Sequence, residues 1–94
     1  MSNKYYVYFL TSNTNTVLYI GVTNDINRRT IEHIDGKSRF SKRYNAHKLI
    51  YYEEYSEVLC AIAREKQLKR WSRAKKNALV ETLNPEWKEL RALS

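Results

Sequence analysis

The chain has 94 residues, 17 of them basic and 10 acidic, which gives a formal net charge of +7. This length suits a single domain with one core and leaves no room for a second. The sequence has no charged and apolar leader and no apolar run of about 20 residues, so we expect neither secretion nor membrane insertion but a cytoplasmic location. One cysteine excludes an internal disulfide, and with two histidines it is too few for a structural zinc cluster.

The basic residues gather in two stretches, which favours a polyanionic partner and nucleic acid above all. Residues 37–48 contain five basic residues and no acid, with Phe40 and Tyr44 among them. Residues 64–76 contain seven basic residues and one acid. Basic side chains can neutralise phosphates while aromatic rings stack on bases. The residues that we expect to contact nucleic acid are Lys37, Arg39, Lys42, Arg43, Lys69, Arg70 and Arg73.

Two runs rich in tyrosine and β-branched residues, 4–10 and 17–23, flank a polar stretch and predict an antiparallel hairpin. Successive side chains of a strand point to opposite faces. This alternation gives Tyr8 to one face of the first run, and it gives Tyr19 and Gly21 to one face of the second. One face of the hairpin can therefore carry two phenols and a bare patch of backbone.

A helix is predicted over 26–34, because position 24 or 25 offers an N-cap residue and a glycine follows at 36. Arg29 and His33 are one turn apart on this helix and share a face, whereas Arg28 points elsewhere. The next stretch, 37–46, has no clear period and is predicted to be a loop.

A third strand is predicted at about 48–55, followed by a helix that begins at 56 or 57 and runs to Trp71. Helical spacing sets Glu65 within the apolar stripe of this helix, so we expect its carboxylate to face the core side and not the solvent. A charge in that position lowers stability unless a cation meets it.

Ser72 is the expected N-cap of a further helix over 73–83, with Asn77 close to the inward face. Proline suits the first position of a helix, so a short terminal helix over 86–92 is predicted to follow Pro85. The order is then β-β-α-β-α-α-α. The sequence predicts one α+β domain, 1–94, with a small three-stranded antiparallel sheet flanked by helices.

The triplets Tyr6-Val7-Tyr8 and Tyr19-Ile20-Gly21 resemble the double signature of the GIY-YIG nuclease superfamily, although Tyr6 replaces its first glycine. The resemblance continues with an arginine eight positions past the glycine, a histidine one turn later, a glutamate on the helix after the third strand and an asparagine twelve positions beyond that. The chain is similar to the small standalone branch, whose domain resembles the N-terminal domain of excision-repair nucleases. The matching positions are Tyr8, Tyr19, Arg29, His33, Glu65 and Asn77.

This resemblance implies a metal-dependent endonuclease that cleaves structured or single-stranded nucleic acid, DNA rather than RNA, in a repair role. Glu65 would hold Mg²⁺ or Mn²⁺, ions that accept few protein ligands and keep several waters. Arg29 would clamp the scissile phosphate. Tyr8, Tyr19 or His33 would orient or deprotonate the attacking water, and the role of proton acceptor stays open between Tyr8 and His33. A separate protein would supply sequence specificity.

Two other classes of function fit the composition. One is a nucleic-acid-binding module that keeps the fold and its basic surfaces without efficient catalysis. The other is a protein-interaction adaptor whose charge is incidental, which salt-insensitive partner binding would indicate. Glu65 could simply pair with Lys69 at i+4, an interaction worth about 0.2–0.5 kcal/mol. That pairing does not explain a carboxylate on the apolar stripe, which favours the enzyme.

Overall fold

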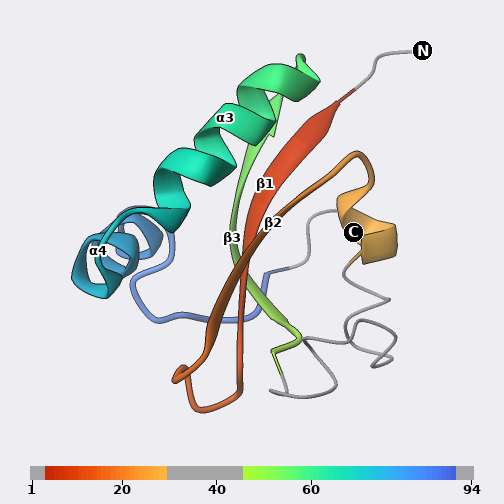
Figure 1. Cartoon of the computed structure of the whole chain (residues 1–94). Helices are drawn as coiled ribbons and strands as arrows, with labels where there is room; N and C mark the ends of the chain where they lie inside the picture. The colour runs from red at the N-terminus through yellow and green to blue at the C-terminus, as the bar shows by residue number, and fades with distance from the viewer. Residues whose placement is uncertain (1–3, 30–45, 91–94) are drawn as a thin grey trace.

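A computed structural model describes residues 4–29 and 46–90 and confirms the predicted α+β architecture (Figure 1). The sheet is antiparallel, with its three strands in the order β2-β1-β3. Each of the three strands and the two long helices begins and ends within two residues of its predicted bounds. The elements are β1 (Tyr5–Thr11), β2 (Leu18–Thr23), β3 (Lys48–Tyr55), α3 (Val58–Lys69) and α4 (Arg73–Leu83).

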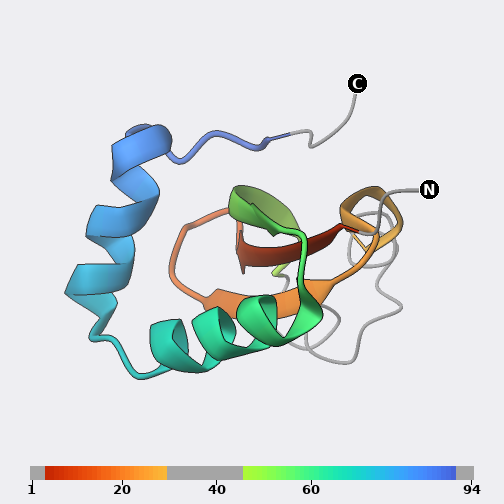
Figure 2. The same cartoon turned by 90° about the horizontal axis from the view of Figure 1, so that it is seen from above.

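The central strand, β1, is covered on both faces, which explains why its sequence is apolar at nearly every position. Val7 and Phe9 point to the face on which α3 and α4 pack. Tyr8 and Leu10 point to the other face, where Ile26 packs against them. Viewed from above, α3 runs along one side of the strands and the helical residues 26–29 lie apart from it (Figure 2).

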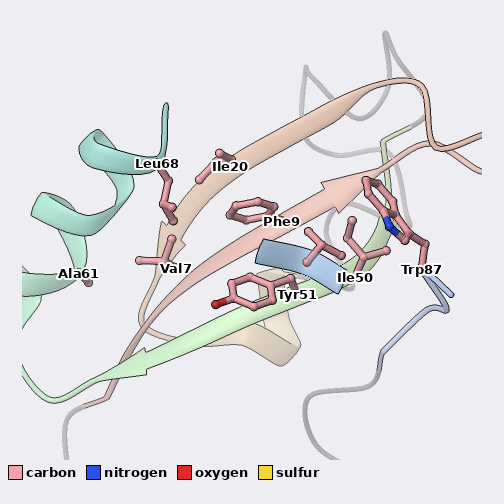
Figure 3. Packing of buried hydrophobic residues seen from close by; sticks show 9 residues of the cluster. Val7, Phe9, Ile20, Ile50, Tyr51, Ala61, Leu68 and Trp87 are labelled. Carbon is pink, nitrogen blue, oxygen red and sulfur yellow. The ribbon is translucent and has the colours of Figure 1, made fainter. Parts of the chain in front are cut away.

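The larger core lies between the sheet and α3. Leu68 of α3 lies beside Val7 and Ile20, and Trp87 closes the other end of the cluster next to Ile50 (Figure 3). Burying a large apolar side chain of this kind contributes roughly 1.5–3 kcal/mol. This layer fixes α3, and with it the direction in which the side chains of α3 leave the helix.

The helix predicted from residue 26 begins where the sequence indicates. Asp25 is its N-cap: the Oδ1 atom of Asp25 accepts a hydrogen bond of 3.0 Å from the Arg28 backbone N–H. Residues 26–29 are helical. The rest of the predicted helix lies outside the described residues, as do the predicted site residues His33, Lys37, Arg39, Lys42 and Arg43.

The short helix predicted over 86–92 is wrong for the residues described there, because 86–90 form a turn and an extended segment. The side chain of Asn84 instead ties this segment to itself and to β3. Its Nδ2 donates to the carbonyls of Ile50 and Lys88 at 2.9 and 2.8 Å, and its Oδ1 accepts from the Lys88 N–H at 3.0 Å. The Leu90 N–H then donates to the Leu49 carbonyl at 2.7 Å. The segment therefore lies along β3.

The N-cap predicted at Ser72 is confirmed, because its Oγ accepts a hydrogen bond of 3.2 Å from the Lys75 N–H and starts α4. No helix within the described ranges is long and apolar enough to cross a membrane.

Candidate active site

Tyr8 and Gly21 face each other across the ladder between β1 and β2. A Cβ atom built on Gly21 would lie 2.5 Å from the Tyr8 hydroxyl oxygen and 2.7 Å from its Cζ atom. The phenol of Tyr8 therefore lies over bare backbone of β2, and any larger residue at position 21 would displace it. The predicted face with two phenols and a patch of backbone is confirmed.

The hydroxyl of Tyr8 accepts a hydrogen bond of 3.1 Å from the Arg29 Nε atom. This bond joins the sheet to the first turn of the helix that Asp25 caps. Tyr8 is 1% exposed, and burial raises the pKa of its hydroxyl to about 12; the neighbouring Tyr19 also raises it, while Arg29 opposes the shift. Tyr8 therefore keeps its proton at neutral pH and holds the guanidinium of Arg29 in place.

Tyr19 lies next to Tyr8 on the same face of the sheet, with ring centroids 6.1 Å apart and planes inclined at 46°. It differs from Tyr8 in being only partly buried. Of the two motif tyrosines, Tyr19 is thus the one that water can reach.

A cleft of about 370 Å³ opens beside Arg29 at the end of β2. It is lined by residues from both faces of the sheet and by the first residue of α3: Tyr5, Val22, Thr23, Asn24, Arg28, Arg29 and Val58. Arg28 was expected to point elsewhere, but it borders the same cleft as Arg29. The helix is in its first turn at this point, so adjacent residues both reach the cleft. The cleft is therefore lined by two arginines, the residue type best suited to binding an anionic oxygen.

Glu65 lies on α3, which packs on the face of the sheet opposite to Tyr8. Its side chain is 20% exposed and its Oε2 atom lies 3.3 Å from the Lys69 Nζ atom. Arg64 and Glu65 flank the buried stripe of Ala61 and Leu68 on opposite sides. Because Arg64 reaches Glu53 of β3, Glu65 lies on the flank turned toward the edge strand β2.

Two features of this position suit a metal ligand. Val58, seven residues before Glu65 and so on the same side of α3, lines the cleft beside Arg29. The ion pair with Lys69 is an i,i+4 contact worth only about 0.3–0.5 kcal/mol, so the carboxylate can exchange partners. Within the described ranges no three His, Cys, Asp or Glu side chains gather as a metal site. A single carboxylate fits a hard cation that keeps most of its waters, such as Mg²⁺ or Mn²⁺.

The structure brings Asn77 and Arg73 together on α4, away from the Tyr8 face of the sheet. The Oδ1 atom of Asn77 accepts a hydrogen bond of 2.9 Å from Arg73 Nε. The Nη2 and Nη1 atoms of Arg73 donate to the carbonyls of Asn15 and Thr16, at 2.9 and 3.1 Å. Asn15 has a positive φ of 60°, so the clamp holds the turn between β1 and β2 in a conformation that few residues adopt. Both side chains thus support this turn.

A second polar cluster that the sequence did not reveal is centred on Glu53 of β3. Its carboxylate accepts hydrogen bonds from the hydroxyls of Tyr51 and Tyr55, at 2.5 and 2.7 Å, and from Arg64 Nε and Nη2, at 2.9 and 3.0 Å. Burial alone would raise the pKa of Glu53, but the bonds from Arg64 and the two tyrosines outweigh it and lower the pKa. Burial and the bonded carboxylate raise the pKa of Tyr55 to about 12 and that of Tyr51 further.

Comparison with known proteins agrees with this geometry. The family model for the GIY-YIG catalytic domain matches residues 4–78. UPF0213 proteins from Syntrophus aciditrophicus, Natronomonas pharaonis and Staphylococcus epidermidis are 37, 35 and 31% identical to the chain. The matches cover 89, 85 and 84% of this chain and 97, 94 and 96% of the relatives.

A solution NMR structure of a UPF0213 protein from Bacillus halodurans has a TM-score of 0.59 and 27% identity, and the match covers 97% of each chain. The fold and the paired tyrosine motif are those of a GIY-YIG catalytic domain, and the chain belongs to the GIY-YIG family. The relatives named above are UPF0213 proteins, and the chain spans nearly their whole length.

Proposed function

We propose that this protein is a divalent-metal-dependent endonuclease that hydrolyses phosphodiester bonds in structured or single-stranded DNA. Membership of the GIY-YIG family supports nuclease chemistry on nucleic acid. The observation that carries the proposal is the 3.1 Å bond from Arg29 Nε to the buried hydroxyl of Tyr8, beside a cleft that Arg28 also lines. A guanidinium held in a fixed orientation at a cleft is suited to binding a phosphate.

Hydrolysis of a phosphodiester requires an activated water, stabilisation of charge on the phosphoryl oxygens and help for the departing 3′ oxygen. Arg29 would bind the scissile phosphate through its Nη groups, while its Nε bond to Tyr8 fixes the plane of the guanidinium. Arg28, at the same cleft, would neutralise a neighbouring phosphate.

The attacking water would contact Tyr19 and not Tyr8. Tyr8 is buried and its raised pKa keeps it protonated, so its role is to position Arg29. Tyr19 is partly exposed on the same face and can orient a water. The proton would pass to Tyr19 or to the predicted base His33, and neutral histidine has the lower ordinary pKa.

Glu65 would hold Mg²⁺ or Mn²⁺ at the β2 edge. The bound ion would stabilise negative charge on the phosphoryl and leaving oxygens. The position of Glu65 on the side of α3 shared with Val58 supports this role, because Val58 borders the cleft. Asn77, bonded to Arg73, would have no part in the reaction.

The proposal is tested with end-labelled single-stranded, branched and duplex DNA, and with the corresponding RNA, each incubated with Mg²⁺, Mn²⁺ or a chelator. We expect metal-dependent internal cleavage of the single-stranded or branched DNA. Binding across the panel without cleavage under any condition would favour the binding module instead. If the protein neither binds nor cleaves any nucleic acid of the panel, the result would favour the protein-interaction adaptor.

A further inference from the structure

The structure divides the basic stretch 64–76 into cations whose charged group bonds a polar atom of the described residues and cations whose charged group does not. Three of the seven have partners already described: Arg64 bonds Glu53, Lys69 pairs with Glu65, and Arg73 clamps the turn between β1 and β2. The sequence predicted that Arg73 contacts nucleic acid, but its hydrogen bonds to this turn give it a structural role. The cations left for an external partner are Lys66, Arg70, Lys75 and Lys76.

Two of these cations, Lys66 and Arg70, line one concavity beside α3, and Lys75 lies against the ring of Trp71, which also lines it. A cleft of about 470 Å³ is lined by Ala63, Lys66, Gln67, Arg70 and Trp71. From α4, the Lys75 Nζ atom lies 4.3 Å from the centre of the Trp71 ring. Across the described ranges, no ion pair joins Lys66, Arg70 or Lys75 to a carboxylate. We call this concavity the α3-α4 cleft.

The α3-α4 cleft is held in place by the fold and lies apart from the Tyr8 cluster. Trp71 forms its floor, because it is partly buried and packs against the main core. Lys66 lies on the exposed side of α3 and Arg70 is the C-cap residue four positions later, while Glu65 lies on the flank toward β2. Ser72, the N-cap of α4, accepts a hydrogen bond from the Lys75 N–H and so fixes the point at which Lys75 leaves α4 toward Trp71.

We propose that the α3-α4 cleft is a second nucleic-acid-binding site, which holds the phosphodiester backbone outside the segment that is cleaved. The proposal rests on the proposed function for its partner class. The cleft is lined by two exposed cations and by no described acid, so its charge is complementary to a polyanion. Cations spread over two helices suit the repeated charges of a nucleic-acid backbone better than a single small anion, which needs converging fixed donors.

The test measures binding of a fluorescent single-stranded DNA by anisotropy, in chelator, over a series of salt concentrations. Lys66→Gln and Arg70→Gln each remove one charge from the α3-α4 cleft. Lys88→Gln removes one charge from the exposed segment after α4, where Lys88 pairs with Glu86, and is the matched control. We expect each cleft variant to weaken binding and to make the slope of log K against log salt shallower by about 0.7. Lys88→Gln should leave the slope unchanged.

The proposal would be overturned if the cleft variants and Lys88→Gln lose DNA affinity equally, or if none of them loses DNA affinity. Anionic phospholipid vesicles form a further arm: if they bind more tightly than DNA and the cleft variants abolish that binding, a membrane surface is the partner instead. Binding in chelator requires no catalysis. If the protein does not cleave DNA but its DNA binding is weakened by the cleft variants, only the proposed function is contradicted. If it cleaves DNA and the cleft variants do not weaken binding, only this inference is contradicted.

Discussion

The phenol of Tyr8 occupies the space that a side chain at position 21 would need, so Tyr8 and Gly21 form one structural unit across β1 and β2. We expect Gly21→Ala to displace Tyr8, break its bond to Arg29 and abolish cleavage. Overpacking of this kind lowers the free energy of unfolding by about 1–3 kcal/mol. The free energy of unfolding from denaturant titration, with cleavage rates, checks both effects.

A double-mutant cycle separates the clash from a general effect of alanine on β2. With Tyr8→Ala in the background, Gly21→Ala should cost much less stability, because the ring that it strikes is gone. If the cost is the same in both backgrounds, the clash is not with Tyr8.

Tyr8→Phe tests whether Tyr8 positions Arg29 or accepts a proton. The ring remains over Gly21, and the variant loses only the hydroxyl that accepts from Arg29 Nε at 3.1 Å. Because the pKa of Tyr8 is raised to about 12, we expect the rate to fall by the same factor at every pH between about 6 and 9. If the pH profile of kcat/KM for Tyr8→Phe lacks an ionisation that the wild-type profile shows, Tyr8 would instead be the base.

Much of the fold was predictable because its signals are local. Runs rich in tyrosine and β-branched residues mark the strands, and Asp25 and Ser72 cap their helices as their side-chain chemistry indicates. The prediction of a terminal helix was wrong because the segment is held by bonds to β3, which is distant in sequence: Asn84 Nδ2 donates to the Ile50 carbonyl and the Leu90 N–H to the Leu49 carbonyl. Pairings across 34 residues leave no local pattern to recognise.

The Glu53 cluster and the buried Tyr8 make stability depend on pH in a defined direction. Tyr8, Tyr51 and Tyr55 have pKa values raised above the ordinary 10.0, so their contribution is complete below pH 10.0 and is lost as pH rises toward about 12 and above. The pKa of Glu53 is lowered, so its contribution is present above the ordinary 4.5 and is lost as pH falls below it. We expect a plateau of stability between these limits.

Unfolding followed by circular dichroism, with tyrosinate absorbance measured in parallel, checks this profile. Tyr51→Phe should reduce the loss of stability on the alkaline side. Glu53→Gln should cost about 2–3 kcal/mol at neutral pH, less than the 3–5 typical of a fully buried pair, because both partners retain some solvent contact. A Glu53→Gln variant as stable as the wild type would show that the cluster contributes little to folding.

Substitutions of Arg73 test whether this residue stabilises the turn between β1 and β2. Arg73→Ala removes the donors to the Asn15 and Thr16 carbonyls, and we expect a loss of about 1–2 kcal/mol in unfolding free energy. Arg73→Lys should not restore it, since an ammonium cannot reproduce the forked guanidinium geometry. The salt slope of DNA binding should match that of wild type. If Arg73→Ala has a shallower salt slope and an unchanged unfolding free energy, Arg73 contacts nucleic acid instead of supporting the fold.

The candidate site was predictable in part, and the division has a physical basis. Tyr8, Tyr19 and Gly21 meet because strand alternation and register place them, so sequence spacing was sufficient. Asn77 lies at a plausible spacing from Glu65, but Arg73, four residues before it, takes its side chain. The nearness of Arg28 to the cleft depends on how the helix meets β2, which no periodicity encodes.

The measurement that most directly tests the account is metal-dependent cleavage of the preferred DNA by the wild type, Glu65→Ala, Arg29→Ala and Lys69→Ala, each shown to be folded. Lys69→Ala is the control, because it removes the partner of Glu65 and leaves the carboxylate. We predict that cleavage disappears in the Glu65 and Arg29 variants and persists in Lys69→Ala, while Glu65→Ala still binds DNA in chelator. Full cleavage by Glu65→Ala or Arg29→Ala would contradict the assignment of this site.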